Sequence, residues 1–294
     1  MPLLQAIRVA AAFMFLSLAL SGCGKKDDSG GSLSAKATTK EKSATTSGDS
    51  PSLPSVAGKL DKYTPVDMSA DMDAKGWLAY RDQFAHALAA VPDINDRTLA
   101  EAGIAEVGTE PDSFKREDLI KARADAIKAL RKSATPKLHI SWGTEIRGNT
   151  PVAMVSPYDH ETQSYKIQIE SINGYLVGRG WKTAATGLQD TVSYRVNLAG
   201  IASSQYPTGI VKKVAPDQAR GIEAQIARLR QNASAPAMLP VSVYGTVSGT
   251  NQATWNLAVL DISADAIALH LPKEPIGAPT ILIDGPEIKA PQRP

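Results

Sequence analysis

The hydrophobic periodicity of the chain changes near Pro136, and this change limits the folds that it can adopt. Before Pro136, apolar residues recur every three or four positions and share one face of a helix, as in Trp77, Tyr80, Phe84 and Leu88. After Pro136, apolar and polar residues alternate, as in strands with one buried face. The sequence therefore predicts an α+β fold, with N-terminal helices followed by a mainly antiparallel sheet.

Several helices are expected before the change. The first ends before Pro92, because proline cannot continue a helix. A second begins near Asn95, and a third is capped by Asp112 or Ser113 and extends through Leu130. Basic residues crowd the third helix. We interpret them as a solvent-exposed face that acidic neighbours balance, and the alternative is a patch that faces anionic lipid headgroups.

The Asn-Gly dipeptide at residues 173–174 predicts a hairpin, because a type I′ turn needs positive φ angles at both central residues. We expect the strand of Ile167 and Ile169 to pair across this turn with the strand of Gly178 and Gly180.

One inserted helix, from Ala215 to Leu229, interrupts the predicted sheet. After it we expect an antiparallel meander whose turns lie at residues 249–251 and 263–264. The expected strands cover residues 241–247, 255–262, 267–271 and 281–283.

The composition divides the chain into five parts. Residues 24 to 58 are rich in Ser, Thr, Gly and Lys and cannot bury enough apolar surface to order themselves, so they predict a flexible tether. The helical segment follows, then the β part, which belongs to the same or a second domain, and finally a Pro-rich disordered tail. The expected boundaries are 1–22 (signal peptide), 23–58, 59–135, 136–285 and 286–294.

The N-terminal apolar run, Val9 to Leu20, has the length of the hydrophobic region of a signal peptide. It is too short to span a bilayer, which takes about 20 residues. Leu20-Ser21-Gly22-Cys23 follows it, and these residues resemble the lipobox of bacterial lipoproteins. The resemblance implies cleavage before Cys23, a diacylglyceryl group on its sulfur and a further acyl chain such as palmitate on its amino group.

Cysteine usage agrees with this resemblance. Cys23 is the only cysteine, so the chain can form no internal disulfide and no zinc site that needs several thiolates. Two or three acyl chains hold a protein firmly on a membrane. In Gram-negative lipoproteins an Asp after the cysteine favours the inner membrane. Gly24 occupies that position here, which favours the outer membrane, with the folded module in the periplasm.

The charged residues are nearly balanced, with 32 Lys and Arg against 30 Asp and Glu, so no nucleic-acid partner is expected. We find no catalytic motif, no metal-binding spacing and no cofactor fingerprint in the sequence. His139 and His270 alternate with apolar residues and are expected to face solvent. His160 is the ligand-binding candidate, because Asp159 and Glu161 flank it and could raise its pKa or help to hold a cation.

The leading hypothesis is a non-enzymatic binding or structural module of the cell envelope. Lipid on Cys23 would attach the module to the membrane. A partner protein of the envelope could bind by adding a strand to an edge of the sheet. One alternative is an envelope hydrolase with a site near His160. The other is a carrier of a small molecule or lipid, with a pocket between helices and sheet.

Overall fold

The computed structural model describes residues 60–69, 73–146, 150–169, 176–182, 189–197 and 210–289. All of them belong to one compact unit, Asp49–Pro294. The predicted signal peptide, the lipobox with Cys23, the tether and the hairpin turn at residues 173–174 lie outside the described residues.

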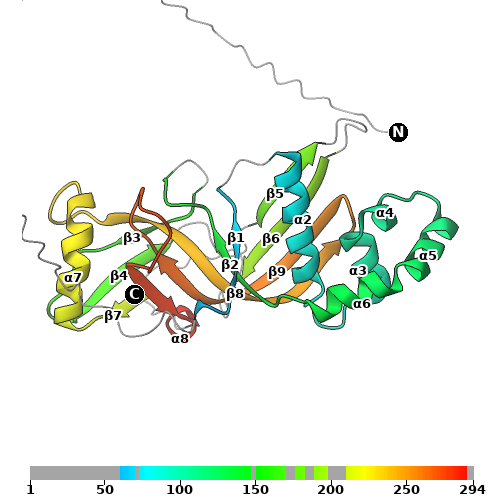
Figure 1. The fold of residues 1–294 in the computed structure, drawn as a ribbon. Coiled ribbons are helices and arrows are strands. Elements are labelled where there is room, and N and C mark those ends of the chain that lie inside the picture. Colours follow the sequence, from blue (N-terminus) through cyan, green and yellow to red (C-terminus); the bar gives the residue numbers. More distant parts are fainter. Residues whose placement is uncertain are drawn as a thin grey trace, which may run out of the picture. The chain divides into compact units, whose positions relative to one another are not determined.

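The N-terminal helices agree with the predicted ones in position (Figure 1). Asn95 caps α3 by accepting a hydrogen bond from the Thr98 N–H at 2.8 Å, and Asp112 caps α5 in the same way. The third predicted helix is interrupted at Arg123, so it forms two helices instead of one. The helices of this part are α2 (Ala74–Leu88), α3 (Asp96–Gly103), α4 (Ala105–Gly108), α5 (Ser113–Ala122) and α6 (Ala124–Lys132).

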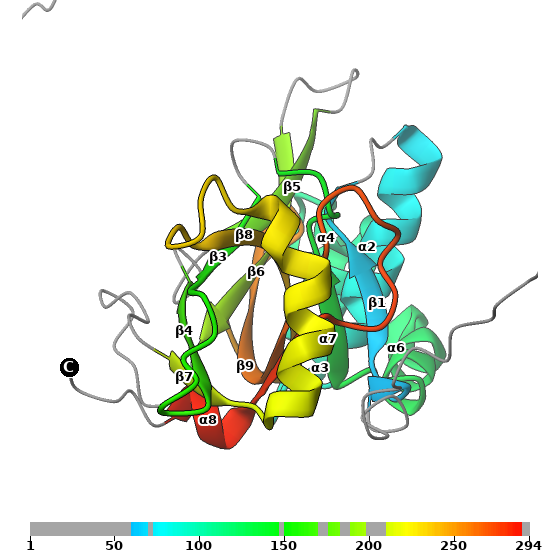
Figure 2. The same cartoon turned by 90° about the vertical axis from the view of Figure 1, so that its left-hand side faces the viewer.

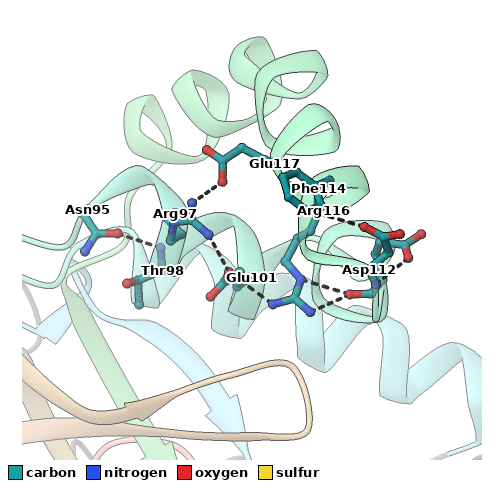
Figure 3. A network of polar contacts seen from close by, with 9 residues as sticks. Asn95, Arg97, Thr98, Glu101, Asp112, Phe114, Arg116 and Glu117 are labelled. Carbon is teal, nitrogen blue, oxygen red and sulfur yellow. Dashed lines mark hydrogen bonds and ion pairs between the residues drawn. The ribbon is translucent and has the colours of Figure 1, made fainter.

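The basic side chains of this part form ion pairs between helices (Figure 3). Arg97 pairs with Glu101 of its own helix and with Glu117 of α5. Arg116 of α5 reaches back to Glu101 at 3.6 Å. No residue of α5 is buried, and the acidic partners neutralise most of its charge. The arrangement agrees with a solvated face.

The sheet is mainly antiparallel, as predicted, and its path runs β5-β6-β9-β8-β3-β4-β7. Only β1 with β2 and β6 with β9 pair in parallel among the described strands. β10 joins β9, and β2 joins β8. The strands are β1 (Thr64–Asp67), β2 (Lys137–Ser141), β3 (Val152–Val155), β4 (Ser164–Ile169), β5 (Leu176–Lys182), β6 (Gln189–Asn197), β7 (Ile210–Lys213), β8 (Ala237–Ala253), β9 (Leu257–Leu269) and β10 (Ile281–Asp284).

The long hairpin of β8 and β9 corrects the predicted meander. Both strands are continuous through the expected turns at residues 249–251 and 263–264, and the chain reverses only at residues 254–256. Three register shifts between the two strands absorb the irregular residues. A bulge accommodates an extra residue without ending the strand. The polar residues at 249–251 and 263–264 lie within or beside such irregularities, and the predicted turns at these positions are therefore wrong.

The predicted pairing of the strand of Ile167 with the strand of Gly180 is also wrong. Ile167 pairs with Val155 of β3 and with Ile210 of β7, whereas Gly180 pairs with Thr191 of β6. The turn chemistry indicated a hairpin between these two strands, but each pairs with another neighbour in sequence, β4 with the preceding β3 and β5 with the following β6.

One hydrophobic core joins helices and sheet. Phe84 of α2 packs edge-on against Tyr194 of β6, with ring centroids 5.6 Å apart, and both are fully buried. Arg81 follows the same face and donates to the carbonyls of Trp255 and Ala102, each at 3.0 Å. This guanidinium connects α2, α3 and the turn between β8 and β9.

At the C-terminal end, helix α8 (Gly285–Lys289) follows β10. Helical structure thus continues past residue 286, where the sequence predicted the tail to begin. Within the described ranges, no helix is long and apolar enough to cross a membrane.

Candidate functional site

A groove lies between the β3–β4 loop and the inserted helix α7 (Pro216–Ile226), which the short 3-10 helix η1 (Ala227–Leu229) extends. Figure 2 shows the position of α7 in the fold. The predicted inserted helix is thereby confirmed. Ile222 and Ile226 of α7 are buried, and this anchors the helix. The groove has a volume of about 530 Å³, within the range of about 300–1,000 Å³ that is usual for small-molecule sites.

Small apolar residues and polar groups share the walls of the groove. Ala219 and Ala227 leave space along the helix, and Pro157 and Pro216 add apolar surface. Polar side chains surround this surface, which therefore combines an apolar floor with hydrogen-bonding groups: His160, Arg220, Glu223, Arg230 and Asn232.

Tyr158 fixes the loop against the helix. Its hydroxyl donates to the Val214 carbonyl at 2.8 Å, and its backbone N–H donates to Glu223 Oε1 at 3.3 Å. Its ring meets the His160 ring edge-on, with centroids 5.0 Å apart. The loop therefore presents His160 on a positioned aromatic support.

An ion pair closes one side of the groove. Arg230 contacts both carboxylate oxygens of Glu223, at 2.5 and 3.0 Å, and donates to the Ser156 carbonyl at 3.1 Å. The Arg230 side chain is only 5% exposed. Burial raises the pKa of Glu223. The hydrogen bond and charge of Arg230, together with hydrogen bonds from Tyr158 and Tyr165, outweigh burial and lower that pKa below its ordinary value. The carboxylate thus stays ionised and paired.

Asp159 has a local structural role. Its carboxylate accepts hydrogen bonds from the Thr162 hydroxyl at 2.8 Å and from the N–H groups of Glu161 and Thr162. The hydroxyl and N–H of Thr162, with the N–H of Glu161, lower the pKa of Asp159. These bonds form an Asx turn that shapes the loop before β4.

Of the three candidates predicted from the sequence, only His160 lines the groove. Asp159 closes the turn, and Glu161 is exposed outside the groove lining. Among the residues that the structure describes, no group of three or more His, Cys, Asp or Glu could hold a metal ion. A cation site around His160 therefore receives no support from neighbouring ligands.

The prediction that His139 and His270 face solvent is wrong. His270 is 3% exposed, and both rings hydrogen-bond to the hydroxyl of buried Ser242. Alternation correctly placed these residues on the face opposite the main core. That second face is itself covered, because Tyr63 and Leu60 pack on Tyr244 there.

The sequence analysis did not single out Glu223 and Arg230. They lie seven residues apart, two turns along α7 and η1, so they fall on one side of the helical segment. A carboxylate and a guanidinium at this spacing, next to small residues, would have been the signal.

Comparison of the chain with protein-family models, with curated proteins and with solved structures finds no match. The basis for a functional assignment is therefore the groove itself.

Proposed function

We propose that this chain is a lipid-anchored envelope protein whose folded module binds another envelope component in the groove beside α7. The observation that carries the binding site is a groove of about 530 Å³ with an apolar floor and converging polar groups. Ligand sites have this combination, in which apolar surface supplies affinity and a few polar groups fix orientation. The membrane anchor is lipid on Cys23, as the lipobox resemblance implies.

The groove chemistry favours binding over hydrolysis. Its described lining includes no serine, threonine or cysteine that could act as a nucleophile. The carboxylate that is present, Glu223, is held ionised by Arg230 and is a poor general base because its pKa is lowered. Within the described part of the chain, no hydrogen bond orients the His160 ring. A hydrolase at His160 would need a nucleophile, a general base and a group that orients the His160 ring, and residues outside the described lining would have to supply them.

Site-specific photo-crosslinking in intact cells tests the binding site. A photoreactive residue at Asn232, in the groove wall, should capture a defined adduct. The same residue at Gln225, on the exposed side of α7, should not. Ala227→Trp, which fills the groove from an exposed position, should abolish the Asn232 adduct. Equal capture from Asn232 and Gln225 would refute the groove as the binding site, and mass spectrometry of the adduct distinguishes a protein from a lipid or small molecule.

Mass spectrometry of the mature chain tests the anchor separately. The expected N-terminal peptide begins at Cys23 and carries a diacylglyceryl group, and Cys23→Ala should release the protein from the membrane fraction. An unmodified Cys23 would overturn the anchor but leave the groove unaffected.

A further inference from the structure

A hydrogen-bonded bridge of three side chains lies on the face of the sheet opposite the main core. The Ser242 hydroxyl of β8 is 2.9 Å from Nε2 of His139 on β2 and 2.8 Å from Nε2 of His270, which follows β9. Ser242 is 1% exposed and His270 is 3% exposed. The Ser242–His270 bond is therefore buried, and the His139–Ser242 bond is partly buried.

When both histidines are neutral, two equivalent proton arrangements satisfy every hydrogen bond of this bridge. A serine hydroxyl has a single hydrogen, so it donates to only one imidazole. The other imidazole must carry its hydrogen on Nε2 and donate to the serine oxygen. If the accepting ring gains a proton, its Nε2 becomes a donor too, and the serine hydrogen loses its acceptor. Protonation of both rings also places two positive charges on either side of one oxygen.

No described side chain stands ready to neutralise such charges. Burial, and then the nearby His270, lower the pKa of His139 to about 4, and burial lowers the pKa of His270. The carboxylate of Asp265 is already engaged by the Tyr63 and Thr246 hydroxyls. The elements around the bridge also carry other titratable groups. They are Asp61 and Lys62 beside Tyr63, Asp67 on β1, Lys137 on β2, Tyr244 on β8, Asp261 on β9, Asp284 on β10, and Lys273 and Glu274 after His270.

The bridge supports an aromatic stack that ends at the N-terminal segment of the described unit. The Tyr244 ring stacks flat on the His139 ring, with centroids 4.0 Å apart and planes at 3°. The Tyr63 ring meets Tyr244 edge-on at 5.2 Å, and its hydroxyl donates to Asp265 at 3.0 Å. Leu60 packs against the cluster that Tyr244 forms with Ala266 and Ala268. Displacement of His139 therefore removes the support under the Leu60–Tyr63 segment.

We propose that the His139–Ser242–His270 bridge is an acid-sensitive lock, which holds the Leu60–Tyr63 segment on the sheet at neutral pH and releases it in acid. Leu60 lies two residues after the predicted tether ends at residue 58, so the lock controls where the folded module begins. The lock involves neither the groove nor Cys23, and it holds or fails independently of the proposed function.

Hydrogen exchange on the full chain in detergent, followed by mass spectrometry, tests the lock. After correction for the intrinsic pH dependence of exchange, the amide of Tyr63, which donates to the Leu60 carbonyl at 3.2 Å, should exchange faster at pH 5 than at pH 7.5, and the amides of α2 should not. If release returns His139 to its ordinary pKa of about 6.5, opening becomes about thirtyfold more favourable at pH 5. Protection that persists at pH 5 would overturn the lock.

Variants separate the bridge from other histidines. The double variant His139→Gln/His270→Gln cannot gain protons and should lose the acid response. His86→Gln is the matched control, because His86 bonds to Ser133 far from the bridge, and it should respond like the wild type. If the double variant does not fold, NMR titration of the wild type decides: the two rings should titrate together with the opening of residues 60–63. Titration without opening would overturn the lock.

Discussion

Arg81 offers a demanding test of how the helices are attached to the sheet. Its side chain is among the few buried charged ones in the described structure, with 5% exposure. It donates to two carbonyls, Trp255 O and Ala102 O, and its guanidinium lies 3.7 Å from the Trp255 ring centroid. Hydrogen bonds from a charged donor contribute about 1.5–3 kcal/mol each. The cation–π contact adds about 0.5–2 kcal/mol.

Burial works against these gains, since it lowers the pKa of Arg81 to about 10. Arg81→Met removes that cost but leaves the Trp255 and Ala102 carbonyls without this donor, at about 1–3 kcal/mol each. We expect the free energy of unfolding to fall by about 3 kcal/mol. Arg81→Lys should lower the free energy of unfolding less than Arg81→Met does. The lysine variant should still be less stable than the wild type, because one ammonium cannot reproduce the planar set of donors of a guanidinium.

Urea denaturation of the full chain, followed by far-UV circular dichroism, measures this change. Arg228→Met is the control, because Arg228 is 68% exposed and its ion pair with Glu274 is 4.0 Å long; it should cost less than about 1 kcal/mol. If Arg81→Met is no more destabilising than Arg228→Met, the assigned role of the guanidinium is incorrect.

Two further predictions concern close packing and the groove. A Cβ atom on Gly108 would lie 2.5 Å from Trp255 Cβ and closer still to the Glu101 carbonyl, so Gly108→Ala should destabilise the protein by about 1–3 kcal/mol. Gly249→Ala, whose Cβ would approach nothing nearer than 3.8 Å, should change the Tm much less, and equal effects would contradict the packing described. Glu223→Gln should destabilise the protein at pH 7, because it leaves the guanidinium of Arg230 buried without its counter-charge. The lowered pKa of Glu223 means that its stabilising effect is present above its ordinary value of about 4.5 and is lost as the pH falls through the lowered value. Denaturation curves of both proteins should therefore converge in acid, and a gap that widens at low pH would contradict the ion-pair account.

Local sequence signals predicted the helices well. The apolar stripe that includes Trp77 and Phe84 is the buried face of α2. The second helix begins next to Asn95 as predicted, and Asp112 caps the helix that it was expected to cap. These signals work because a helix satisfies its backbone within a few residues and its caps are neighbours in sequence. The inserted helix α7 was found for the same reason.

The pairing of strands was predicted less well. Ile169 pairs with Ala153 and not with Gly178, because strand partners are chosen by packing across the whole sheet. Of the candidate site, His160 was identified from its flanking carboxylates, yet neither carboxylate acts with it in the groove. The ion pair that lines the same groove, Glu223 and Arg230, comes from α7 and from the residue after η1, more than 60 residues farther along the chain.

The amino-acid sequence by itself determined the order of helices and strands, their inward faces and the lipobox-like N-terminus, since each depends on residues close together in the chain. Only the tertiary structure decided whether the strand faces opposite the main core are exposed to solvent. Alternation places His139 and His270 away from the main core, but the segment of Tyr63 then covers Tyr244, which stacks on His139. The burial of an outward face depends on what else the chain packs there, and no local pattern contains that information.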